Sequence, residues 1–220
     1  TVKLHPDRLV ELGSVVPEAD LAQYNQAYLN EGYIDGKLYI LPVAKSTEIL
    51  YLNETDWETF AGDTGADKEM LKTWEGLAQA AGMYYEWSGG SPFLGMNAFN
   101  DFAALSAAQL GEGIRWTQDG PEFNYSKDTA RRVWDAYYVP HIKGWYESRT
   151  YNQDGIKSGR LMAYIGSSAG AGFFPQVVIE DEKQSHPISC KSYAYPVFQG
   201  GTSYMGQRGA NMAVFSTDES

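Results

Sequence analysis

Segments with the pattern of β-strands alternate with segments of helical pattern along most of the chain, and this alternation constrains the fold more than any other feature. A turn at Asp35 and Gly36 leads into the apolar run KLYILPV, residues 37–43, which has the pattern of a strand. The spacing over 54–83 then predicts two short helices separated by a glycine-rich turn. This order is typical of α/β proteins and not of helical bundles or β-sandwiches. The sequence therefore predicts an α/β fold.

Helix starts are marked by residues whose hydroxyls can accept hydrogen bonds from free backbone amides. Thr73 can cap a helix that begins at Trp74, and Ser126 can cap another helix farther along the chain. Proline lacks the amide that a helix interior uses, so Pro140 is expected to interrupt that later helix. A short apolar helix is also expected near the start of the chain, ending at Gly13.

Two helices carry apolar residues at helical spacing, which predicts a buried face for each. The first ends at Gly111 and is expected to place Phe99, Phe102, Leu105 and Leu110 on one side. The second begins after Ser126 and is expected to place Ala130, Val133, Trp134 and Tyr137 on its inner face. Most aromatic residues in these helices are expected to be core residues.

Two polar interruptions beside apolar strands are the main candidates for a binding site. In LPVAKSTEILYLN, residues 41–53, the polar segment Lys45–Glu48 separates two apolar runs. In SGRLMAYIGSSAGAGFFPQVV, residues 158–178, an apolar strand leads into a Ser-Ser-Ala-Gly-Ala-Gly turn, which predicts a helix N-terminus at Ser167 or Ser168. Such a turn can hold a phosphate, a carboxylate or sugar hydroxyls, or it can serve only as a helix cap. The spacing of the residues favours neither the ligand-binding turn nor the helix cap, because neither a Walker A nor a G-x-G-x-x-G pattern is present.

Charge and composition argue against several classes of function. Only 17 Lys and Arg residues stand against 28 acidic ones, and the net charge of −11 disfavours a nucleic-acid partner. The single Cys190 cannot form an intrachain disulfide, and the three histidines lie in unrelated contexts, so no metal or other cofactor is expected. No apolar run approaches the length of a membrane span.

Aromatic residues are abundant, and those within glycine- and serine-rich segments have less reason to be core residues. Tyrosine and tryptophan faces can stack on the apolar faces of sugar rings. The candidates are Tyr84, Tyr85, Trp87, Trp116 and Tyr204, out of 16 Tyr and 6 Trp. No G-x-S-x-G motif supplies a serine nucleophile. A carbohydrate-active hydrolase would need acidic residues near these aromatics, and Glu86 is the one candidate.

Four segments occur in a characteristic order: YIDGKLYILPVAKSTEILYLNETDWETFAG, LKTWEGLAQAA, IKSGRLMAYIGSSAG and YMGQRGANMAVFSTD. In this order they resemble the extracellular solute-binding proteins of ABC importers, and among them the family 1 branch for sugars, oligosaccharides and glycerol phosphates. The resemblance covers most of the chain from about residue 30 onward. Family members are nearly twice as long, so it implies a central fragment that lacks the N-terminal part of the first lobe and the C-terminal helices.

The resemblance implies an α/β fold of the periplasmic-binding-protein type II, consisting mainly of the second lobe with the segments that cross between lobes. It assigns residues 1–48 to the end of the first lobe and the first crossing, and 49–207 to the second lobe. Residues 208–220 become the return crossing. The Lys-Ser-Thr-Glu interruption would then lie where the chain passes the cleft.

The resemblance also implies the ligand-binding residues. Members place hydroxyls against the ligand after the first strand, which corresponds to Ser46 and Thr47. The serine-rich turn contributes Ser167 and Ser168, and more weakly matched segments contribute Trp87 and Asn97. The late strand contributes Arg208, Gly209 and Asn211, whereas Trp74 is expected to be a packing residue. No catalytic residue is implied.

The function implied is capture of a carbohydrate or glycerol-phosphate ligand without catalysis, for delivery to an ABC permease in the membrane. Location would be extracellular or periplasmic, with a lipid anchor in the full-length bacterial protein, and a monomer is expected. A positive helix end at Ser167 would favour an anionic group. The alternatives are the hydrolase with Glu86 and a structural or adhesion module without a small-molecule site.

Overall fold

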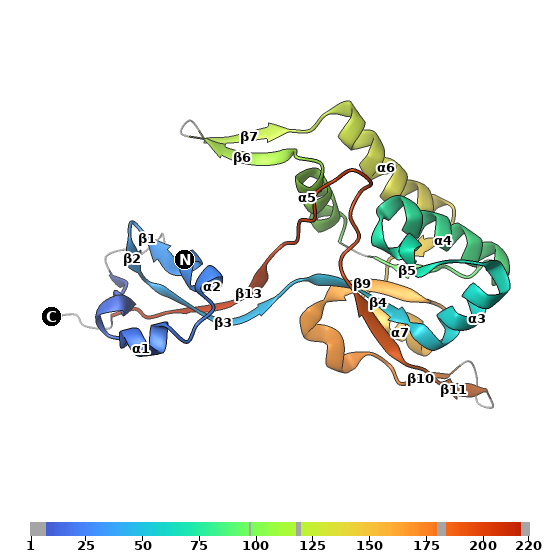
Figure 1. Cartoon of the computed structure of the whole chain (residues 1–220), viewed down its shortest axis with the longest axis horizontal. Helices are drawn as coiled ribbons and strands as arrows, with labels where there is room; N and C mark the ends of the chain where they lie inside the picture. The colour runs from blue at the N-terminus through green and yellow to red at the C-terminus, as the bar shows by residue number, and fades with distance from the viewer. Residues whose placement is uncertain (1–7, 97, 118–119, 180–183, 217–220) are drawn as a thin grey trace. The chain divides into compact units, whose positions relative to one another are not determined.

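The computed structural model describes residues 8–96, 98–117, 120–179 and 184–216 (Figure 1). The chain divides into two units, which follow contacts and not sequence order. One unit combines Thr1–Ser46 with Gln207–Ser220, and the other is the continuous segment Thr47–Gly206. The assignment of these parts to the lobes of a longer protein stays a prediction.

The first unit consists of short helices and two antiparallel strand pairs. In chain order its elements are η3 (Leu12–Ser14), α1 (Glu18–Leu21), α2 (Gln26–Leu29), η4 (Asn30–Gly32), β1 (Tyr33–Ile34), β2 (Lys37–Leu38), β3 (Ile40–Ser46) and β13 (Arg208–Ala213). Strand β1 pairs with β2, and β3 pairs with β13 in a register that sets Ser46 opposite Arg208. The core of this unit is small and contains Leu12, Leu29, Leu38 and Leu41.

Residues near the start of the described chain form an extended segment and not the predicted helix. Leu9 forms a bridge to Phe215, and the Val10 amide donates to the Val214 carbonyl at 2.9 Å. A strand partner from the other end of the sequence takes the hydrogen bonds that a helix would have used, so the helix expected to end at Gly13 is wrong. The turn at Asp35 and Gly36 is confirmed, with φ of 50° and 78°. Two positive φ values are what a two-residue hairpin turn requires.

The second unit contains most of the helices and one larger sheet. Its elements are β4 (Glu48–Asn53), α3 (Glu54–Thr64), η5 (Lys68–Lys72), α4 (Trp74–Trp87), β5 (Leu94–Gly95), α5 (Phe99–Gln109), β6 (Gly113–Thr117), β7 (Gly120–Asn124), α6 (Lys127–Ile142), β8 (Tyr146–Glu147), α7 (Asn152–Lys157), β9 (Ala163–Ser167), η6 (Ser168–Phe173), β10 (Val177–Ile179), β11 (Ser185–Pro187) and β12 (Cys190–Tyr193).

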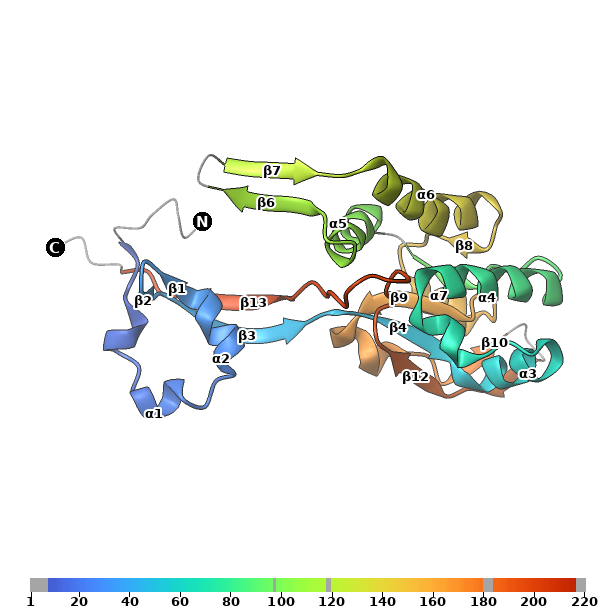
Figure 2. The same ribbon diagram turned by 45° about the horizontal axis from the view of Figure 1, so that its top comes forward.

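The sheet of the second unit has five strands in the order β12-β4-β9-β5-β8. Strand β4 is antiparallel to both β12 and β9, whereas β5 is parallel to β9 and β8. Helices α3 to α6 cover one face, and α7, η6 and the β10–β11 hairpin cover the other (Figures 1 and 2). The β6–β7 hairpin projects from the helical side of the unit. Alternating strands and helices thus build the α/β fold that the sequence predicts.

The helix starts in this unit follow the predicted caps. The Thr73 hydroxyl accepts from the Gly76 amide at 3.1 Å, and the Ser126 hydroxyl accepts from the Thr129 amide at 3.1 Å. Trp74 is fully buried and is a packing residue, as expected. Helix α6 does not stop at Pro140 but continues to Ile142.

The face that α6 turns inward differs from the predicted one at two residues, Ala130 and Trp134, which are both exposed. Val133 is buried, but Trp134 is 51% exposed and stacks on Tyr138, with ring centroids 3.9 Å apart. Ala130 and Trp134 are four residues apart and share one side of α6, whereas the buried residues are Thr129, Val133, Ala136 and Pro140. Neither Ala130 nor Trp134 is therefore a core residue.

Candidate functional site

Thr47 lies where three segments of the second unit meet. Its amide donates to the Ser168 hydroxyl at 3.1 Å, and its carbonyl accepts from the Ser168 amide at 2.7 Å. The Thr47 hydroxyl donates to the Gly206 carbonyl at 3.0 Å. Strand β4 begins at the next residue, where Glu48 pairs with Ser167 on β9. Two predicted site segments, the polar interruption and the serine-rich turn, thus meet at the ends of β4 and β9.

The hydroxyls at this junction differ in what they can still offer to a ligand. Ser168 Oγ and Ser167 Oγ act as acceptors, from the Thr47 amide and from the Ala169 amide at 3.3 Å. A serine hydroxyl has one donor and two acceptor positions, so both serines keep their O–H for a ligand. Thr47 uses its O–H on Gly206 and keeps acceptor capacity. Both serines are partly exposed, which leaves them accessible.

The segment after Ser167 begins a helix at the predicted place, and this helix is a short 3₁₀ helix and not an α-helix. Residues Ser168–Phe173 form a 3₁₀ helix of 6 residues, with Ser167 as its cap. Two glycines, Gly170 and Gly172, stand in this short segment and weaken a regular helix. A short 3₁₀ turn lacks the aligned peptide dipoles of a long α-helix. The helix dipole therefore supports an anionic ligand group at Ser167 only weakly, and that preference stays a prediction.

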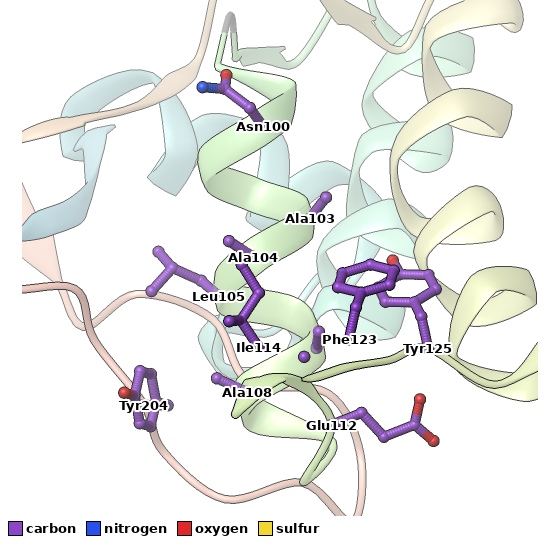
Figure 3. Close-up of a pocket in the computed structure, with 12 residues that line it drawn as sticks. Asn100, Ala103, Ala104, Leu105, Ala108, Glu112, Ile114, Phe123, Tyr125 and Tyr204 are labelled. Carbon is purple, nitrogen blue, oxygen red and sulfur yellow. The ribbon is translucent and has the colours of Figure 1, made fainter. Parts of the chain in front are cut away.

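A pocket of about 390 Å³ lies between α5, the β6–β7 hairpin and the segment that returns past Tyr204 (Figure 3). Ala104 and Ala108 form its floor, and Phe123 and Tyr125 flank it with stacked rings. Leu105 lines this pocket, and a Cβ built on Gly206 would lie 3.4 Å from Leu105 Cδ2. The pocket and the Thr47 junction are therefore neighbours through Gly206.

Four predicted site residues lie in the first unit, on the paired strands β3 and β13. Ser46 faces Arg208 and Gly209 faces Lys45 in the register, and a bulge precedes Asn211. A Cβ on Gly209 would lie 1.9 Å from the Ala44 carbonyl oxygen, so close strand approach is a structural reason for this glycine. The ligand-binding roles of Ser46, Arg208, Gly209 and Asn211 stay predictions.

The remaining predicted residues do not join the junction. The Trp87 indole nitrogen donates to Asp63 at 3.0 Å, and its ring lies 5.6 Å from that of Phe60. Its ligand role stays a prediction, although these contacts give it a packing function. Asn97 lies outside the described residues. Glu86 is exposed in the last turn of α4.

Sequence reasoning missed the pocket residues Asn100, Phe123 and Tyr125, although it singled out Tyr204. The β6–β7 hairpin that carries Phe123 had a local signal, because the turn-favouring dipeptide Asp119-Gly120 stands in the sequence where β7 begins. The approach of Tyr204 to α5 and the hairpin had no such signal, since α5 and β6 follow one another but Tyr204 is far away in the sequence.

Two further observations concern the described residues alone. They contain no group of three or more His, Cys, Asp or Glu side chains that could hold a metal ion. Among the helices they form, none is both long and apolar enough to cross a membrane.

The sequence model of the bacterial extracellular solute-binding protein family matches residues 7–219, and the chain belongs to this family. This is the class of protein that the sequence predicts. The location is therefore extracytoplasmic. No curated protein matches the sequence at a significant level.

Solved structures of binding proteins share the fold. UgpB from Mycobacterium tuberculosis, in complex with glycerophosphocholine, matches with a TM-score of 0.73 at 16% identity, over 97% of this chain and 52% of that chain. The cyclic α-maltosyl-1,6-maltose binding protein from Arthrobacter globiformis gives 0.68 at 16% identity, over 99% and 54%. The GacH receptor of Streptomyces glaucescens, solved unliganded and with acarbose, gives 0.64 at 16% identity, over 96% and 53%. The chain thus spans about half the length of these proteins, and the predicted fold class is confirmed.

Proposed function

We propose that the whole protein to which this chain belongs is the solute-binding component of an ABC importer and captures its ligand without catalysis. One observation carries the proposal for the site. Ser167 and Ser168 present two hydroxyl donors at the ends of β4 and β9, and each hydroxyl already accepts one hydrogen bond within the protein. Fixed donors of this kind can orient the oxygen atoms of a polar ligand without chemical activation.

We propose a carbohydrate or a glycerol-phosphate compound as the ligand. The family and the ligands named for UgpB, GacH and the maltosyl-maltose binding protein support this range. Adjacent hydroxyl donors suit sugar hydroxyls and phosphate oxygens alike. The aromatic pocket beside the junction supplies apolar faces of the kind that pack on sugar rings.

The partners follow from the proposed role. We propose an ABC permease as the membrane partner, a lipid anchor as the means of attachment, and a monomer as the working form. The net charge of −11 supports the absence of a nucleic-acid partner. A hydrolase based on Glu86 has no support, because that carboxylate is exposed and does not line the pocket beside α5.

Calorimetric titration of the chain with neutral oligosaccharides, glycerol 3-phosphate and glycerophosphocholine tests the proposal. Ser168→Ala is expected to weaken binding of the ligand that is found by about tenfold, as loss of one hydrogen bond to a ligand does. Ser158→Ala is the matched control, since its hydroxyl bonds to the Asp154 carbonyl within α7 and is away from the junction. Equal effects of the two substitutions, or turnover of a glycoside that Glu86→Gln removes, would contradict the proposal.

A further inference from the structure

The pocket beside α5 has the features of a binding site, separate from the serine junction. The rings of Phe123 and Tyr125 lie nearly parallel, at 4° with centroids 5.6 Å apart, and form one flat apolar wall (Figure 3). Tyr204 stands on the other side of α5 from that wall, and Asn100 stands toward the start of the helix. The small side chains of Ala104 and Ala108 keep the floor between them open.

Phe123 stacks on Tyr125 but stays largely in solvent. It is 71% exposed on the hairpin, although burying a phenylalanine side chain is worth about 2 kcal/mol. Tyr204 is also exposed, at 53%. Large aromatic side chains left in water around one hollow mark a place that a ligand can cover.

The charges around the pocket define what it accepts. Among the described residues that line it, there is no lysine, arginine or histidine. The one charged lining residue is Glu112, which accepts from the Ser126 amide at 2.6 Å. That hydrogen bond lowers the pKa of Glu112 and keeps the carboxylate ionised. An anionic group would therefore meet repulsion and find no counter-charge here.

We propose that this pocket is a second subsite for an uncharged saccharide that lies along α5, with one ring stacked on Phe123 and its other hydroxyls directed to Asn100 and the Tyr204 hydroxyl. The apolar face of a pyranose suits the aromatic wall, and its hydroxyls suit the amide and phenol at the rim. The inference rests on the proposed function for its ligand class. It adds that an extended neutral glycan continues from the serine junction along α5, whereas a phosphate does not.

Amide-resolved NMR titration of the 220-residue chain tests the subsite with maltotriose, cellotriose and xylotriose as probes and glucose 6-phosphate as the anionic comparison. At least one neutral trisaccharide is expected to shift the amides of Asn100, Phe123 and Tyr204. Phe123→Ala is expected to raise its Kd three- to tenfold, the usual range for loss of an aromatic contact. Phe123→Tyr keeps the ring and should keep the affinity. Phe173→Ala is the matched control, because Phe173 is 76% exposed but lies outside this pocket.

The outcomes separate the subsite from the proposed function. Shifts at Ser167 and Ser168 without shifts at Phe123 overturn the subsite and leave the proposed function standing. Tighter binding of glucose 6-phosphate than of the trisaccharides at Phe123 overturns the neutral class of ligand. No shift with any trisaccharide overturns the subsite, and the proposed function then depends on glycerol 3-phosphate and glycerophosphocholine. An equal loss of affinity in Phe123→Ala and Phe173→Ala also overturns it.

Discussion

Thr47, the first residue of the second unit, forms three hydrogen bonds. Its backbone amide and carbonyl bond to Ser168, and its hydroxyl donates to the Gly206 carbonyl. The chain enters the unit at Thr47 and leaves it after Gly206, so the hydroxyl ties the entry segment to the exit segment. A buried or half-buried carbonyl that loses its partner costs more than the hydrogen bond itself was worth. This single side chain therefore matters for stability as well as for the site.

Thr47→Val is expected to lower the unfolding free energy of the second unit by about 1 kcal/mol. Valine has nearly the same shape but cannot donate to the Gly206 carbonyl. Urea unfolding followed by tryptophan fluorescence measures the change. Thr47→Ser keeps the hydroxyl and should lose less than half as much; if serine and valine are equally unstable, the hydrogen bond is not the cause.

Gly209 carries the strongest steric constraint among the predicted site residues. Its φ of 150° is rare for residues with a side chain, and a Cβ would lie 1.9 Å from the Ala44 carbonyl oxygen. Gly209→Ala is therefore expected to destabilise the β3–β13 pair by about 2–4 kcal/mol. Far-ultraviolet circular dichroism during urea unfolding reports the loss. Gly172→Ala, where a Cβ meets nothing within 4 Å, is the control and should change the midpoint little.

At the scale of elements, Glu112 links the end of the α5 segment to the start of α6. Its carboxylate accepts from the amide of Ser126, the residue that caps α6. This hydrogen bond is the main cause that lowers the Glu112 pKa from its ordinary 4.5. A lowered carboxyl pKa in the folded state means that the ionised form is stabilised by folding.

The pH dependence of the unfolding free energy should show the contribution of the hydrogen bond between Glu112 and Ser126. It is fully present above the unfolded pKa and is lost as the pH falls through the lower, folded pKa. Between about pH 6 and about pH 3, the melting temperature of the parent chain should fall more than that of Glu112→Gln. Glu122→Gln on β7 removes the same charge and is the control. Parallel melting curves for the parent chain and Glu112→Gln over this range would contradict the assignment.

Elements whose causes are local could be predicted, and those that depend on distant partners could not. The caps at Thr73 and Ser126 need only an amide three residues away, and both are confirmed. The helix expected before Gly13 failed because Leu9 pairs with Phe215. For the site, the meeting of Thr47 with Ser168 was accessible only through the family's pattern, since no local spacing relates them.

At the scale of the whole molecule, the two units differ in how the chain builds them. The second is one continuous segment, whereas the first depends on pairing between β3 and β13. The second also has most of the core, which includes Trp57, Trp74, Phe60 and Phe93, while the first buries a few leucines. Because stability rises with buried apolar surface, the second unit is expected to be the more stable one.

All six tryptophans lie within Thr47–Gly206, so their fluorescence reports the unfolding of the second unit alone. We expect residues 47–206, expressed by themselves, to fold and to unfold in urea at the fluorescence midpoint of the whole chain. The whole chain should show an additional transition at lower urea by circular dichroism. Gly209→Ala should shift that early transition and leave the fluorescence midpoint unchanged, because Gly209 contacts Ala44 within the first unit. If Gly209→Ala shifts the fluorescence midpoint together with the early circular-dichroism transition, the two units unfold together and Thr47 does not mark a domain boundary.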